Sequence, residues 1–162
     1  MYVPPEELGL EKKDHFFEAS DGTELHGWEF RGKEKNPDLY VLFFHGNAQN
    51  LTAHYLNFHW LPSMGGSFFI MDYRNYGLSD PVEPNPQGTH KDALAALNYG
   101  YQLFQKSGAK KLVVYGQSLS GAIIMRALED FNRQEQIDLV VLDSTYPSYE
   151  RIAREKTETA WI

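Results

Sequence analysis

One serine stands in a context that suits nucleophilic chemistry. Ser118 lies in "GQSLSG" (116–121), directly after the apolar run "KLVVYG" (111–116). If a strand ends and a helix begins here, Ser118 occupies a sharp turn with a strained backbone. Gly116 and Ser120, two positions away on either side, are small enough for the helix to approach the strand. Such a turn would expose the hydroxyl and point helix N–H groups at the atom it attacks.

The elements that must hold Ser118 follow from the spacing of apolar residues. Nearly continuous apolar runs, typical of strands in a parallel sheet, occupy 39–46, 67–77, 111–116 and 138–144. Segments of helical length follow them at 50–60, 92–106, 122–133 and 147–161. Two strand-like runs flank Asp21-Gly22, which favours a hairpin, and the Pro/Gly-rich stretch 79–89 predicts a surface loop. We therefore expect one α/β domain over 1–162, with a mostly parallel sheet, helices on both faces and an N-terminal antiparallel hairpin.

Three loops at the carboxyl ends of these strands carry distinctive residues, and parallel sheets place their chemistry there. They are "HGNAQN" (45–50), "DYRNYGLSD" (72–80) and "GQSLSG" (116–121). The last resembles the nucleophile elbow of the α/β-hydrolase superfamily, and the first resembles its His-Gly-x oxyanion loop. Within the superfamily, the chain is similar to BEM46-like, ABHD-like and serine-aminopeptidase-like serine hydrolases over roughly residues 14 to 155.

The resemblance implies a role for each matching residue. Ser118 would be the nucleophile, and the backbone N–H groups of Asn47 and Leu119 would form the oxyanion hole. The residues expected to brace these loops are His45, Gly46, Gly116, Ser120 and Gly121. Ser120 replaces the glycine usual in this pattern, and we interpret it as a tolerated small residue. The implied reaction is hydrolysis of a small ester, thioester or amide through an acyl-enzyme, with no cofactor and no metal.

A serine hydroxyl needs a base to take its proton, and this base is missing. In the superfamily, an acid and then a histidine follow the nucleophile in the chain. The histidines here are His15, His26, His45, His54, His59 and His90, and none follows Ser118. Asp143, at the end of the last apolar run, is a weak candidate for the acid. We therefore expect the chain to be inactive by itself.

The resemblance also predicts an incomplete domain. A complete member has about eight strands, with a cap after the sixth and the acid and histidine after the last two. This sequence is then the N-terminal part, truncated after about strand six, without the cap and the C-terminal acid and histidine. Residues 139–142 would form an exposed edge that pairs with the missing C-terminal part or with another copy.

Two other functions stay open at this stage. The chain could be a non-catalytic remnant or binding module that keeps the fold, which the missing histidine favours. The loop 116–121 could also be an anion cradle, but no lysine follows it as in a phosphate-binding G-x-x-x-x-G-K-[ST] loop.

The composition of the chain argues against several kinds of partner, cross-link and metal site. A net charge of −7 without a run of Lys or Arg disfavours nucleic acid as partner. The absence of cysteine excludes disulfides and Cys-ligated metals. The start of the chain has no signal-peptide pattern, and no apolar stretch reaches the length of a membrane span. Together these features favour a cytoplasmic location.

Overall fold

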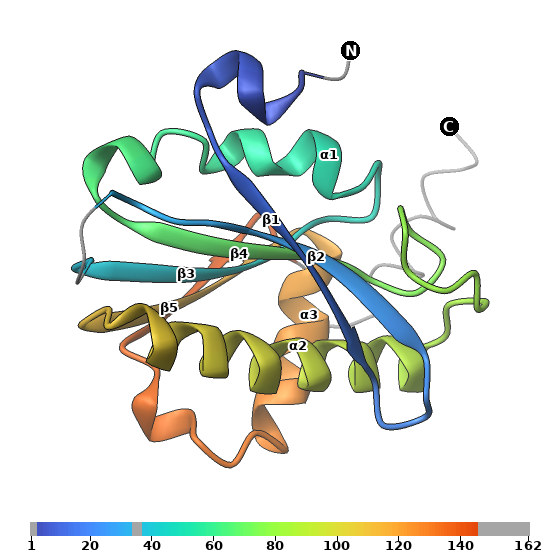
Figure 1. Ribbon diagram of the computed structural model, residues 1–162. Coiled ribbons are helices and arrows are strands. Elements are labelled where there is room, and N and C mark those ends of the chain that lie inside the picture. The colour runs from blue at the N-terminus through green and yellow to red at the C-terminus, as the bar shows by residue number, and fades with distance from the viewer. Residues whose placement is uncertain (1–2, 34–36, 146–162) are drawn as a thin grey trace, which may run out of the picture.

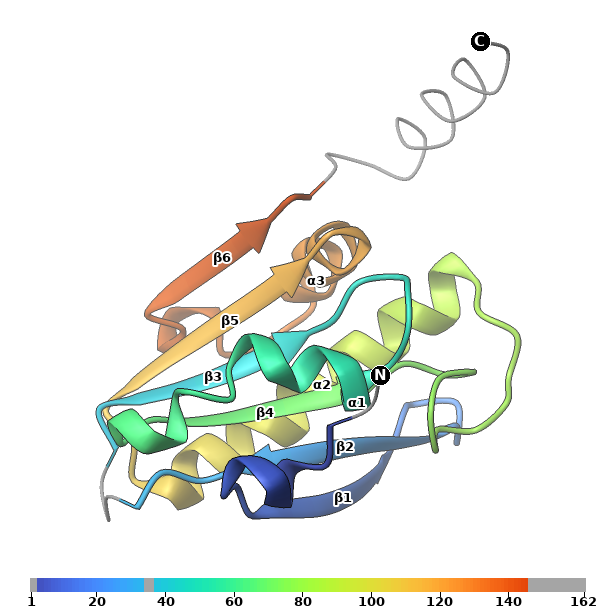
Figure 2. The same ribbon diagram turned by 90° about the horizontal axis from the view of Figure 1, so that it is seen from above.

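The computed structural model describes residues 3–33 and 37–145, which form one six-stranded sheet in the order β1-β2-β4-β3-β5-β6 (Figures 1 and 2). β1 (Lys12–Glu18) and β2 (Glu24–Phe30) form the antiparallel hairpin, and β2 pairs antiparallel with β4 (Ser67–Asp72). β3 (Leu39–Phe44), β5 (Lys111–Gln117) and β6 (Leu139–Asp143) run parallel to β4. The predicted α/β fold with its N-terminal hairpin is confirmed.

Helices cover both faces of the sheet (Figure 2). α2 (Pro86–Ser107) and α3 (Leu119–Glu129) pack on one face, over a core that includes Leu42 and Val114. α1 (Leu51–His54) lies on the other face and continues into the 3₁₀ turns Tyr55–Asn57 and Pro62–Met64. Two further 3₁₀ turns are Pro5–Leu8 and Gln134–Gln136. The strands alternate their side chains between two cores, so each face buries an apolar layer.

The helix expected over 50–60 is wrong in length. It ends at His54, and 3₁₀ turns replace the rest. Side chains take the carbonyls that a longer helix would use: His59 Nδ1 bonds to Leu56 O at 2.6 Å, and Trp60 Nε1 donates to Asn57 O at 3.0 Å. Local side-chain bonds of this kind compete with the helical ladder.

The other two described helices begin earlier than predicted. α2 starts at Pro86, inside the stretch expected to be a loop, because the Asn85 side chain accepts hydrogen bonds from Gln87 N and Gly88 N. Asn as N-cap followed by Pro is a strong helix start. α3 starts at Leu119, directly after Ser118, and ends at Glu129. The helix expected over 147–161 lies outside the described residues.

β6 is the edge of the sheet in the described part of the chain, next to β5 (Figure 2). Leu139 and Leu142 on this strand are 54% and 42% exposed. The pairing of 139–142 with further chain stays a prediction. Among residues 3–33 and 37–145, no helix is long and apolar enough to cross a membrane.

Candidate active site

Ser118 occupies a strained turn between β5 and α3. Its backbone has φ 54° and ψ −121°, a conformation that residues with a side chain rarely adopt. The Ser118 N–H donates to Asp143 O at 2.8 Å, so the neighbouring strand β6 supports the turn. Non-glycine residues persist in such conformations when their surroundings hold them, often at functional sites.

Two glycines allow this close approach of helix and strand. A Cβ on Gly116 would lie 2.5 Å from Ile124 Cδ1 and 3.1 Å from Gly121 Cα. A Cβ on Gly121 would lie 1.9 Å from Thr145 Oγ1. The first turn of α3 therefore packs directly against the end of β5 at Gly116, and against Thr145, just after β6, at Gly121.

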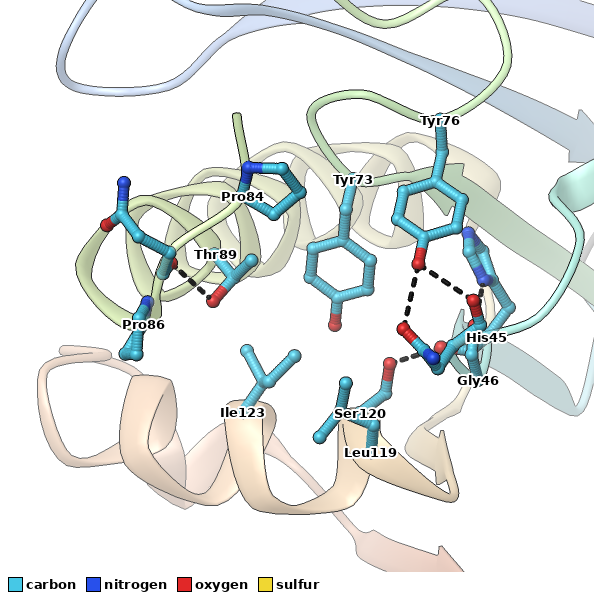
Figure 3. A pocket seen from close by; sticks show the side chains of 12 residues that line it. His45, Gly46, Tyr73, Tyr76, Pro84, Pro86, Thr89, Leu119, Ser120 and Ile123 are labelled. Atoms are coloured by element: carbon cyan, nitrogen blue, oxygen red, sulfur yellow. Dashed lines mark hydrogen bonds between the residues drawn. The ribbon is translucent and has the colours of Figure 1, made fainter. Parts of the chain in front are cut away.

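The loop after β3 lies against Ser118. A Cβ on Gly46 would be 3.4 Å from Ser118 Cβ, which is ordinary van der Waals contact. Three consecutive carbonyls of this loop each have a hydrogen-bond donor (Figure 3). Ser120 Oγ donates to His45 O, His45 Nδ1 donates to Gly46 O at 2.7 Å, and the Tyr76 hydroxyl donates to Asn47 O at 2.7 Å.

These bonds orient the N–H groups between the carbonyls. A peptide is planar and trans, so its N–H points away from its C=O. Because His45 Nδ1 holds the Gly46 carbonyl, the N–H of Asn47 is fixed in the opposite direction. The Tyr76 hydroxyl also lies 3.0 Å from Asn47 Oδ1. The peptide planes of the loop 45–47 are thus held in fixed orientations beside Ser118.

His45 is committed to this loop. Its side chain is buried, and Nε2 lies 3.0 Å from Asp72 Oδ1, although the two groups are not aligned for a hydrogen bond. The ring also stacks on His54, with centroids 5.1 Å apart. Asp72 Oδ1 accepts the Leu51 N–H at 2.7 Å, which anchors the start of α1. The His45 side chain therefore supports the loop and has no hydrogen bond to Ser118.

The other five histidines are engaged elsewhere as well. His15 contacts Glu29 and Tyr99, His26 contacts Asp14, His54 contacts Ala48 O, His59 contacts Leu56 O and His90 contacts Asp130. Burial lowers the pKa of His54. Within residues 3–33 and 37–145, no hydrogen bond joins an imidazole to the Ser118 hydroxyl.

Asp143 lies at the end of β6 and pairs in register with Gln117. Its carboxylate accepts the Tyr115 hydroxyl at 2.5 Å and the Ser144 hydroxyl at 2.9 Å. These hydrogen bonds, that of Tyr115 first, lower the pKa of Asp143. Burial, with the bond to Asp143, raises the pKa of Tyr115 to about 12. The backbone of Asp143, the acid candidate, therefore lies next to the turn at Ser118. Its side chain instead bonds to Tyr115 and Ser144.

The loop 72–80 is held by a buried ion pair. The guanidinium of Arg74 contacts Asp92 at 2.7 Å and Asp21 at 3.1 Å, and both Arg74 and Asp92 are buried. The hydrogen bond to Asp92 is the main reason that the pKa of Arg74 is raised. This network fixes the segment that carries Tyr76 to the start of α2.

A cavity of about 290 Å³ opens beside the loop 45–47 and the first turns of α2 and α3 (Figure 3). Its apolar wall consists of Tyr73, Tyr76, Pro84, Pro86, Leu119 and Ile123. Asn47 and Ser120 also line it. The wall residues Pro84 and Pro86 were not expected, because the stretch 79–89 was predicted to be a surface loop. The dipeptide Asn85-Pro86 was the available signal.

In the described part of the chain, no group of three or more His, Cys, Asp or Glu side chains could hold a metal ion. The arrangement instead offers a hydroxyl, backbone N–H donors and an apolar cavity.

The sheet order and the serine turn at the carboxyl end of β5 define an α/β protein with its candidate site at the strand ends. A family model described as alpha/beta hydrolase fold matches residues 40–160. The chain therefore belongs to the α/β-hydrolase family.

Several known proteins are similar to this chain. The uncharacterized protein YfhR of Salmonella typhi is 35% identical over 150 residues, which cover 86% of this chain and 51% of YfhR. Protein bem46 of Schizosaccharomyces pombe is 31% identical over 156 residues, covering 89% of this chain and 48% of bem46. The Pyrococcus furiosus esterase Pf2001 has a similar structure, with a TM-score of 0.74, 21% identity and coverage of 100% of this chain and 60% of that one. The chain spans about half the length of the curated relatives it matches.

Proposed function

We propose that this chain carries the nucleophile and oxyanion hole of a serine hydrolase that acts on esters, thioesters or amides. Ser118 attacks the acyl carbon, and the N–H groups of Leu119 and Asn47 stabilise the oxyanion that forms. The observation that carries the proposal is the strained Ser118 turn, which lies so close to the loop that a Cβ on Gly46 would be 3.4 Å from Ser118 Cβ. Family membership and the esterase among the similar structures support it.

The proton of Ser118 needs an acceptor that the described residues do not supply. No histidine follows Ser118 in this sequence, so we propose that the base is an imidazole from outside it, in further chain or in a partner. The apolar wall of the neighbouring cavity would accept the acyl group of the substrate. In this scheme Asp143 is a candidate for the acid only if an imidazole reaches the end of β6.

Free imidazole can test the proposal with the 162-residue chain, because it can take the role of the missing base. The assay follows hydrolysis of p-nitrophenyl acetate at rising imidazole concentration and subtracts the reaction of imidazole alone. We expect a protein-dependent rate that rises with imidazole and an acetyl group on Ser118, detected by peptide mass spectrometry. The rate will stay low, because a free base lacks the positional advantage of a bound one.

Ser118→Ala is the decisive control. It should abolish both the imidazole-dependent rate and the acetylation while leaving the thermal unfolding temperature nearly unchanged. Equal rates for the wild type and Ser118→Ala would contradict the proposal.

A second function, a non-catalytic binding module, is favoured by one observation. All six histidines have hydrogen bonds to groups other than the Ser118 hydroxyl. A module of this kind predicts a folded protein with neither acetylation nor turnover at any imidazole concentration. The same assay therefore distinguishes the two.

A further inference from the structure

Ser120 has a contact that its interpretation as a tolerated small residue does not explain. Its hydroxyl donates to the carbonyl of His45, a residue 75 positions earlier in the chain. Ser120 is 1% exposed, so this bond is shielded from water. A glycine at this position, as in the usual elbow pattern, has no side-chain donor. The serine therefore adds a direct link between the first turn of α3 and the end of β3.

The link joins the two elements that carry the proposed oxyanion donors. The Leu119 N–H belongs to α3, and the Asn47 N–H belongs to the loop after β3. The ladder between β3 and β5 ends at the pair Phe44–Gly116, just before both donors. Beyond this pair, the Ser120–His45 bond holds the loop to the helix.

The Ser120–His45 hydrogen bond also fixes the orientation of a peptide plane in the loop. Holding the His45 carbonyl fixes the His45–Gly46 peptide plane, because the peptide is planar. The next plane, which contains the Asn47 N–H, is fixed by His45 Nδ1 on the Gly46 carbonyl. The Ser120 hydroxyl and the His45 ring thus orient two successive peptides, and the second presents the donor.

We infer that Ser120 is a positioning residue for the oxyanion hole. It holds the loop 45–47 against α3 so that the N–H groups of Asn47 and Leu119 converge on one oxygen. The inference rests on the proposed function, since it concerns the same site. Ser120 itself touches no reacting atom and acts through the backbone of the loop.

The test compares the wild type with Ser120→Ala and Ser120→Gly. Ser120→Gly is included as a second variant because the usual elbow pattern has glycine at this position, so this variant should fold. Ser67→Ala is the matched control: Ser67 is also buried, at 2% exposure, and its hydroxyl accepts the Gly32 N–H at 3.1 Å at the opposite end of the sheet. All three variants lose one buried hydroxyl.

The first readout is independent of activity. ¹⁵N relaxation gives backbone order parameters, which are about 0.85 in rigid segments. In both Ser120 variants we expect those of Gly46 and Asn47 to fall below about 0.7, while those of β5 and of the Ser67→Ala control stay unchanged. Unchanged order parameters at Gly46 and Asn47 would overturn the inference.

The second readout is the imidazole-supported hydrolysis of p-nitrophenyl acetate. We expect kcat to fall about tenfold in both Ser120 variants with KM nearly constant, because the oxyanion forms only in the transition state. An unchanged kcat, or an equal fall in Ser67→Ala, would overturn the positioning role. If the wild type shows no Ser118-dependent turnover, the proposed function fails, and the order parameters alone then decide whether Ser120 holds the loop.

Discussion

The turn at Ser118 and the end of β6 lie side by side, but their contacts differ in kind. Around the turn, three loop carbonyls have donors, and two glycines bring helix and strand together. At the end of β6, Asp143 bonds to Tyr115 and Ser144, and no imidazole contacts it among the described residues. One region carries the proposed oxyanion donors, and the other has, among residues 3–33 and 37–145, no imidazole that could take a proton.

The two regions differ because oxyanion binding and proton transfer need different chemical groups. Oxyanion donors are backbone N–H groups, so a sharp turn and a braced loop are enough to create them. Proton transfer needs an imidazole within hydrogen-bond reach of the hydroxyl. The six histidines of this chain have taken structural partners instead.

The largest effect should come from breaking the turn. In Gly116→Val, the added Cβ meets Ile124 Cδ1 and the backbone of Gly121, so helix and strand must separate. Overpacking of this kind costs about 3 kcal/mol, and the displaced turn should lose all Ser118 acetylation. Urea unfolding and the imidazole assay measure the two effects. Met125→Val, at a half-exposed position on α3, is the control and should change stability by less than about 0.5 kcal/mol.

An intermediate effect is expected from the oxyanion loop. Tyr76→Phe removes the hydroxyl that donates to Asn47 O. We expect imidazole-supported kcat to fall about fivefold to tenfold, with a stability loss of about 1 kcal/mol. Tyr99→Phe removes a hydroxyl bonded to His15 Nδ1 and should lose similar stability with full kcat. Equal kcat values in the wild type and Tyr76→Phe would show that the loop needs no such support.

The smallest effect should come from the end of β6. Tyr115→Phe removes the main hydrogen bond that lowers the pKa of Asp143, so that pKa should rise toward 3.8. Carboxyl ¹³C NMR titration measures it. Imidazole-supported turnover should stay the same, because in the proposed scheme Asp143 acts only through a bound histidine. A clear fall in turnover would place Asp143 in the reaction and weaken the contrast between the two regions.

The pH dependence of this pair has a defined sign. Since the folded pKa of Asp143 is lowered, its contribution to stability is present above about pH 4 and is lost as pH falls through the folded pKa. Since the folded pKa of Tyr115 is raised to about 12, its contribution is present below pH 10 and is lost as pH rises from 10 through 12. Tyr115→Phe should remove the Tyr115 share of the alkaline loss and reduce the acid loss, as measured by urea midpoints at each pH. The alkaline loss from Tyr40, Tyr76 and Tyr99, whose pKa values are also raised by burial, should stay.

Much of this protein was determined by its sequence alone. Buried strands, the hairpin at Asp21-Gly22 and the small residues around Ser118 are local patterns, and each produced the expected element. The helix start at Asn85-Pro86 was also encoded locally, but the density of Pro and Gly around it hid the signal.

Only the tertiary structure decided which side chains meet. The bond from Tyr76 to Asn47 spans 29 positions and that from Ser120 to His45 spans 75. Likewise, the partners of His15, His26 and His90 depend on strand register and helix packing, which spacing along the chain does not contain. Hydrogen bonds between distant residues form only after the sheet brings the strand ends together, so local patterns predicted the nucleophile turn and the fold decided how it is braced.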